Sequence, residues 1–180
     1  MERIALPFHD LAARHPGVTS AIGQTFSEAA RVCLDRHPVS SIIFLIYTLG
    51  SGGVATEAIA QWSETTLRKR RAWANATDAT EAGAYGLSLA VVEIEGFVAV
   101  RRAETATGAD YYISPPGSPA DDLEDCIRLE VSGVDRGDER SVHVRLRQKI
   151  QQALSGASSL PAIAAVVGFA ARIIALDHAG

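Results

Sequence analysis

Apolar and polar positions follow two periods along the chain, one typical of helices and one typical of strands. In residues 27–37 the apolar side chains fall on one side of a helix that Ser27 can cap. Residues 41–47 are apolar, β-branched and aromatic without interruption, which indicates a strand covered on both faces. Residues 56–73 predict a second helix. The first 20 residues are interrupted by prolines and predict irregular structure.

From residue 77 onward the pattern is regular enough to predict an order of elements. Asp78 and Glu81 have the spacing of a capping box, and apolar residues follow at helical intervals up to Gly96. The next segments predict strands at 97–103, 110–114 and 126–134, a helix at 141–154, and a strand or strand pair at 162–176. A helix that begins at Pro161 also fits the last segment.

The composition is typical of one globular domain. The chain has 180 residues, and its hydrophobic content of 47% is enough for a core. We expect residues 1–76 to form a helix–strand–helix extension that packs on a core of residues 77–180, in one compact domain. The net charge of −4 and the pI of about 5.7 give no overall attraction to nucleic acid, so a polyanion site has to be local.

The sequence predicts a cytoplasmic protein with no membrane partner. Residues 1–23 lack the continuous apolar stretch of a signal peptide. The longest apolar run, residues 161–176, contains Arg172 and is shorter than the roughly 18–20 residues that span a bilayer. Cys33 and Cys126 lack the spacing of a zinc site and are expected to be buried free thiols.

Two carboxylates are expected to meet on neighbouring strands. Asp110 follows a hairpin turn, and Glu130 lies inside the strand at 126–134 between apolar residues. Oxygen ligands of this kind suit Mg²⁺ or Mn²⁺, so the pair predicts a divalent-metal site. Two alternatives stay open: Asp110 can serve only to end the turn, and Glu130 can form a salt bridge with Arg101 or Arg128.

The order helix, three strands, helix, strand resembles the core of the restriction-endonuclease-like PD-(D/E)xK nuclease superfamily over residues 77–176. The fold implied is a mixed α/β structure with a restriction-endonuclease-like α-β-β-β-α-β core and an N-terminal α/β extension. The resemblance implies that Glu81, Asp110 and Glu130 are the catalytic carboxylates that hold the metal. The alternative for Glu81 is that it only completes the capping box with Asp78.

The chain departs from the family pattern at Ser132, where the family has a lysine two residues after the glutamate. A neutral hydroxyl cannot supply the positive charge with which that lysine positions or activates the attacking water. Either Lys149 on the following helix reaches the site as the catalytic lysine, or the site has lost catalysis. In one branch of the family this helix carries further polar residues that face the site, and Gln148 and Gln152 match them.

A basic cluster at the end of the helix predicted for residues 56–73 is the candidate contact for phosphates, together with Gln148 and Gln152. It consists of Arg68, Lys69, Arg70 and Arg71. Cations favour a helix C-terminus through the macrodipole, and the alternative is that both groups are solvated helix surfaces.

The sequence therefore leaves two candidate functions. The first is a Mg²⁺-dependent phosphodiesterase that acts on DNA or RNA. The second is a nuclease-fold protein that has lost catalysis and binds or organises a larger bacterial assembly, with a second copy of the chain or another protein as its partner. The acidic pI and Ser132 favour the second function, and the three acidic positions favour the first.

Overall fold

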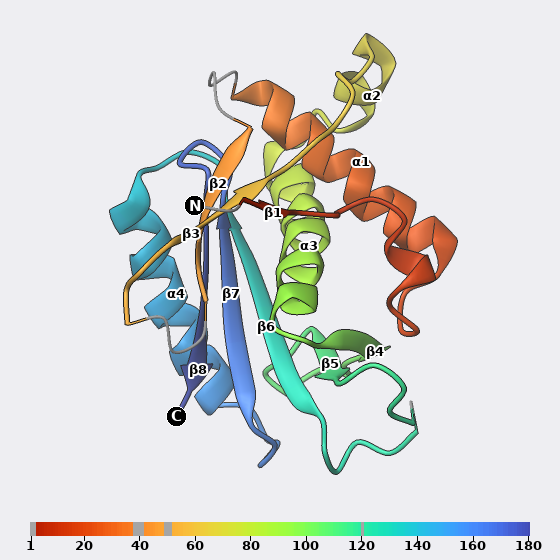
Figure 1. Cartoon of the computed structure of the whole chain (residues 1–180), viewed down its shortest axis with the longest axis vertical. Helices are drawn as coiled ribbons and strands as arrows, with labels where there is room; N and C mark the ends of the chain where they lie inside the picture. The colour runs from red at the N-terminus through yellow and green to blue at the C-terminus, as the bar shows by residue number, and fades with distance from the viewer. Residues whose placement is uncertain (1–2, 38–41, 49–51, 120) are drawn as a thin grey trace.

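The computed structural model describes residues 3–37, 42–48, 52–119 and 121–180. In these ranges the chain forms one mixed sheet of eight strands with helices on both faces (Figure 1). The predicted mixed α/β class is confirmed. The strands are β1 Ile4–Ala5, β2 Ile43–Tyr47, β3 Thr56–Ile59, β4 Val98–Arg102, β5 Tyr111–Ser114, β6 Ile127–Val134, β7 Ala162–Gly168 and β8 Ile173–Ala179. The helices are α1 Ser20–Arg36, α2 Leu67–Ala72, α3 Ala76–Ile94 and α4 Glu139–Leu154, with a 3-10 turn η1 at Leu11–Ala13.

The strand order is β1-β3-β2-β8-β7-β6-β5-β4. Strands β4, β5 and β6 form an antiparallel meander, and β6 pairs with β7 in parallel. Strand β8 runs antiparallel to β7 and carries the sheet on to β2 by a parallel pairing. The N-terminal strands thus extend the same sheet as the C-terminal half of the chain.

Helices α1 and α3 pack against each other and cover one face of the sheet (Figure 1). Small residues on α3 allow this close approach. A Cβ atom on Gly83 would lie 2.9 Å from Ala30 Cα of α1, a distance that packed atoms do not tolerate. The largest hydrophobic cluster, which includes Leu87, Leu129 and Phe169, lies in this layer.

Helix α4 covers the opposite face over β6, β7 and β8 (Figure 1). Asp138 caps α4 by accepting from Ser141 N at 2.9 Å, and Val142 and Leu146 are buried against Val166 of β7. Strand β7 is buried along its whole length. Cover on both faces explains its uninterrupted apolar sequence.

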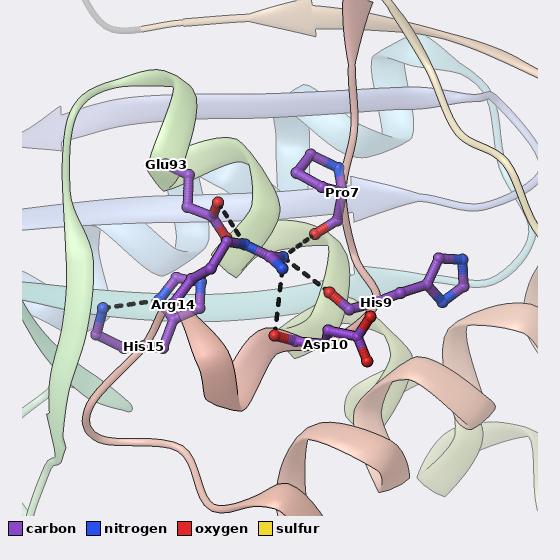
Figure 2. A network of polar contacts seen from close by, with 7 residues as sticks. Pro7, His9, Asp10, Arg14, His15 and Glu93 are labelled. Carbon is purple, nitrogen blue, oxygen red and sulfur yellow. Dashed lines mark hydrogen bonds and ion pairs between the residues drawn. The ribbon is translucent and has the colours of Figure 1, made fainter.

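A polar network anchors the N-terminal segment to α3 (Figure 2). Arg14 donates from Nη2 to the carbonyls of Pro7 and His9, and from Nη1 to Asp10 O at 3.2 Å. Its Nε lies 2.8 Å from Glu93 Oε2. One guanidinium therefore organises three carbonyls and joins them to a carboxylate on α3.

His15 completes this network from a fully buried position. Ala99 N of β4 donates to His15 Nδ1 at 2.9 Å, so the other ring nitrogen, Nε2, is the donor to Glu93 Oε1 at 2.7 Å. The hydrogen bonds assign the neutral ring to this tautomer. Glu93 is thus shared by Arg14 and His15, and α3, β4 and the N-terminal segment meet at one carboxylate.

The helix predicted for residues 56–73 is wrong. Residues Thr56–Ile59 form β3, which pairs antiparallel with β2, and only Leu67–Ala72 are helical. The apolar positions of this segment fit the period of a helix as well as that of a strand, and the pairing with β2 makes residues 56–59 a strand. Ala58 and Ala60 are fully buried, which a strand in this position permits.

Other boundaries also differ from the prediction. Helix α1 begins at Ser20, because Thr19 accepts a hydrogen bond from Ile22 N, and Ser27 is an interior residue of the helix. The first 20 residues contain β1 and η1 in addition to irregular chain. Of the strand predicted at 41–47, residues 43–47 form β2, residue 42 precedes it, and residue 41 lies outside the described residues.

The remaining elements from residue 97 onward are confirmed, and the last segment is a strand pair, β7 and β8. Cys33 and Cys126 are buried free thiols, as predicted. None of the helices in the described ranges has the length and apolar character needed to cross a membrane.

Candidate functional site

Strands β5 and β6 part at one end, and the candidate site lies there. Strand β5 begins at Tyr111, which pairs with Leu129, whereas β6 continues to Val134. Asp110 N donates to Leu129 O at 2.8 Å, and one further step of the antiparallel register places Asp110 opposite Glu130. Past this point β6 pairs, in the described part of the chain, with β7 alone. Side chains of α3 and α4 reach its free edge.

Asp110 is held by donors from α3 and β6. Tyr85 Oη donates to Oδ1 at 2.6 Å and Val131 N donates to Oδ2 at 2.8 Å. Arg102 Nη2 lies 3.6 Å from Oδ1 and donates to Tyr85 Oη at 3.0 Å, and its guanidinium covers the rings of Tyr85 and Tyr111. Burial, with the nearby charge of Asp110, raises the pKa of Tyr85 far above its usual range, so Tyr85 stays a donor.

Glu130 is almost fully buried and is paired with a lysine. Its side chain is 5% exposed, and Lys149 Nζ of α4 lies 2.7 Å from Oε1. Lys149 also donates to Gln152 Oε1 at 3.0 Å. Burial raises the pKa of Glu130; Lys149 opposes this rise and Asp110 adds to it. The lysine thus reaches the carboxylate from the flank of a helix whose apolar side is buried.

The other partners considered for Glu130 are engaged elsewhere. Arg101 pairs with Glu104 at 2.6 Å on the surface. Arg128 is buried and donates to three carbonyls, those of Thr107, Ala153 and Leu160. These bonds hold the β4–β5 hairpin against the end of α4. The hairpin thereby forms one wall of the site.

Glu81 lies on α3 at the same cavity, and the capping box proposed for it is wrong. Asn75 is the N-cap of α3, and its side chain accepts from the backbone N–H groups of Thr77 and Asp78. Asparagine and aspartate are equally good caps, so spacing alone could not choose between Asn75 and Asp78. Glu81 is an exposed residue inside the helix.

The cavity joins the predicted carboxylates with Lys149 and the hairpin. Its charged lining residues are Glu81, Arg102, Glu104, Asp110, Glu130 and Lys149, and Gln152 lines it as well. A second hollow continues along the free edge of β6, and Glu81 and Lys149 line both. Ser132, where the family has its lysine, lines the second hollow together with Arg145. Gln148 is exposed on α4 and lines neither.

The basic cluster of residues 68–71 lies on α2 and lines neither hollow. Lys69 pairs with Glu28 at 3.0 Å and Arg70 with Glu64 at 2.9 Å. Three of the four residues occupy the last turn of α2, where the helix dipole favours cations.

The carboxylate oxygens in the cavity are suitable ligands for a hard divalent cation. Mg²⁺ is often bound through one or two protein carboxylates plus substrate phosphates, and Asp110 and Glu130 supply two carboxylates in one cavity. Each oxygen of Asp110 accepts one hydrogen bond and so keeps one further lone pair. No three or more His, Cys, Asp and Glu side chains of the described ranges cluster as a metal site.

The sequence did not predict the support of Asp110 by Tyr85 and Arg102. Helical periodicity marks Tyr85 only as a core residue, and the two lie 25 and 8 residues from Asp110. A usable signal was the hairpin register, which pairs Arg102 with Tyr111 and so brings a cation beside Asp110.

The comparisons with known proteins give no family. No protein-family model, no curated protein and no solved structure matches this chain.

Proposed function

We propose that this chain is a divalent-metal-dependent phosphodiesterase that cleaves nucleic acid, with α3, β4, β5, β6, α4 and β7 as a restriction-endonuclease-like core. The observation that carries the proposal is the meeting of Asp110, Glu130 and Lys149 in one cavity, with Lys149 Nζ 2.7 Å from Glu130 Oε1. The order of these elements and the position of each carboxylate support it. A cytoplasmic location is part of the same proposal.

In this proposal Asp110 and Glu130 would hold Mg²⁺ or Mn²⁺, and Glu81 lines the same cavity without joining them in a three-carboxylate cluster. A bound cation supplies a Lewis acid for the phosphate and lowers the pKa of a bound water. Lys149 supplies the positive charge that Ser132 lacks, and it can orient the attacking water and stabilise charge on the phosphate. Tyr85 and Val131 N fix the carboxylate of Asp110, which reduces the motion needed for reaction.

The second candidate is a nuclease-fold protein that has lost catalysis and still binds nucleic acid as part of a larger assembly, and one observation favours it. Both oxygens of Asp110 and one oxygen of Glu130 accept hydrogen bonds from the protein's own donors. A cation must share or displace these donors. A protein that binds nucleic acid without cutting it needs no cation at these carboxylates, so the hydrogen bonds can stay in place.

A cleavage assay separates the two candidates. Labelled single-stranded DNA, duplex DNA and RNA are incubated with the purified protein and Mg²⁺ or Mn²⁺. We expect cleavage by the unchanged chain, a loss of at least about 100-fold in Glu130→Gln, and a loss of about 10²- to 10⁴-fold in Lys149→Met. Both changes keep side-chain size close to that of the original residue.

Matched controls are available on the surface. Glu124→Gln and Arg147→Met make the same chemical changes at exposed positions outside both hollows, and they should leave the rate unchanged. A contaminating nuclease would survive all four substitutions. Binding without metal-dependent cleavage would select the second candidate, and neither binding nor cleavage would contradict both.

A further inference from the structure

Helix α4 is strongly basic within an acidic chain. It carries Arg140, Arg145, Arg147 and Lys149 against a single acidic residue, Glu139, while the whole chain has a net charge of −4. Lys149 is paired with Glu130. The three arginines are exposed and form no ion pair with any residue that the structure describes. Their charge is therefore available to an anionic partner.

The helix phase directs only one of these arginines to the candidate site. Arg145 and Lys149 are four residues apart and share a flank of α4, about 6 Å apart along the helix axis. Both line the second hollow, where Ser132 lies on β6. Arg147 lies on another side of the helix and lines neither hollow.

The two hollows differ in charge. Of the described residues that line the first cavity, four are anionic and two cationic, namely Glu81, Glu104, Asp110 and Glu130 against Arg102 and Lys149. The second hollow has three cationic and two anionic side chains, Arg136, Arg145 and Lys149 against Glu81 and Asp135. Asp135 is moreover paired with Arg36 and His37 at 2.8 and 2.9 Å, and Arg136 Nε lies 3.9 Å from its Oδ2, so Arg145 is the cation of this hollow that has no ion pair among the described residues. A cation suits the first hollow, and an anion suits the second.

We propose that Arg145 binds the phosphate adjacent to the one that is cut, so that the substrate is a chain of at least two phosphates rather than an isolated phosphodiester. This inference rests on the proposed function. The nucleic-acid strand runs from the carboxylate cavity along the free edge of β6 to Arg145. On this path it passes Lys149, which lines both hollows. Arginine suits this role because its planar fork of donors matches phosphate oxygens. Arg145 is a positioning residue and makes no contact with the reacting atoms.

Oligonucleotide binding without metal tests the inference independently of cleavage. The probe is a fluorescein-labelled 12-nucleotide single-stranded DNA, titrated in EDTA at several NaCl concentrations and followed by fluorescence anisotropy. We expect Arg145→Ala to weaken binding severalfold and to reduce the slope of log Kobs against log [NaCl] by about 0.7, the value for one lost phosphate contact on a single strand. Arg147→Ala, with the same charge change on the same helix, should keep the original slope.

The outcomes separate this inference from the proposed function. Cleavage that depends on Glu130 but an unchanged binding slope in Arg145→Ala would overturn the second phosphate site alone. Equal effects of Arg145→Ala and Arg147→Ala would also overturn it, because they would indicate a general effect of charge on α4. A selective effect of Arg145→Ala supports the site even if no metal produces cleavage. Absence of binding by the unchanged chain at low salt contradicts it.

Discussion

Glu130 illustrates how one buried residue couples stability to the candidate chemistry. Burial raises its pKa despite the ion pair with Lys149, so the ionised side chain destabilises the fold relative to its neutral form. Glu130→Gln keeps the shape and removes the charge. We expect an unfolding midpoint at pH 7 equal to or above that of the unchanged chain, measured by thermal denaturation followed by circular dichroism. Cavity residues of proteins often trade stability for function in this way.

The sign of the pH dependence makes this prediction specific. A carboxyl whose folded pKa is raised binds protons more tightly in the folded state, so the stability of the unchanged chain increases as the pH falls into the range between the two pKa values. The difference between Glu130→Gln and the unchanged chain should therefore shrink as the pH falls through the raised pKa. A large loss of stability in Glu130→Gln at pH 7 would mean that the contact with Lys149 outweighs the cost of burial.

The expectation that Asp110 and Glu130 meet on neighbouring segments is confirmed, because the positions of both depend on local patterns. A hairpin turn followed by two alternating strands fixes the register, and the register brings the two residues together. Tyr85 and Arg102 could not be found this way, since their roles depend on how α3 lies across the hairpin. Lys149 was predictable in part: its phase on α4 indicated a flank position, but only the structure identifies Glu130 as its partner.

The network around Arg14 and Glu93 shows how one carboxylate can fix an element that has little regular structure (Figure 2). Burial tends to raise the pKa of Glu93, but hydrogen bonds from His15 and Arg14 outweigh it and lower the pKa. Glu93→Gln should destabilise the fold by about 1–3 kcal/mol, the cost of weakening hydrogen bonds to a charged group. Hydrogen exchange should rise mainly in residues 6–18, because this segment depends on the network.

An exposed ion pair provides the matched control for this element. Glu64 pairs with Arg70 at 2.9 Å, but its side chain is 79% exposed, and such pairs contribute about 0–1 kcal/mol. Glu64→Gln should therefore leave both the unfolding midpoint and the exchange of residues 6–18 unchanged. If Glu93→Gln accelerates exchange equally in α4 and in residues 6–18, the network supports the whole fold and not this segment.

Helices and strands were predictable where the apolar positions clearly followed one period. They were missed where pairing with another segment of the chain determined the secondary structure. Strands β4 and β6 and helix α4 follow from alternation and helical spacing over enough residues to exclude the other period, whereas the uninterrupted apolar segment of β7 also fitted a helix beginning at Pro161. The segment at 56–59 has only four strand residues, and its partner β2 lies about a dozen residues before it. Likewise β1 has two residues and exists only through its pairing with β3. No local pattern specifies a strand of that length.

At the scale of the whole molecule, the two thiols can report whether the sheet unfolds as one cooperative unit. Cys33 is fully buried on α1 in the largest hydrophobic cluster, and burial raises its pKa to about 12. Cys126 is 2% exposed in a small cluster with Val98, Val100 and Tyr112 at the β4–β5 end of the sheet, and burial raises its pKa also. Thiol reagents attack the thiolate, so each cysteine should react only when its surroundings open.

We expect the two thiols to become exposed by different opening reactions of the fold. Cys126→Ala isolates Cys33, and Cys33→Ala isolates Cys126, so that the reaction of each with a chromogenic disulfide can be followed as a function of urea concentration. Cys33 should react through global unfolding, with a urea dependence close to the equilibrium m-value, because exposing it requires separation of α1 from α3 and the sheet. Cys126 should react faster and with a shallower urea dependence, because its small cluster can open with the end of the sheet alone. Equal steep slopes for both would show that the meander β4–β6, which carries Asp110 and Glu130, unfolds only together with the rest of the sheet.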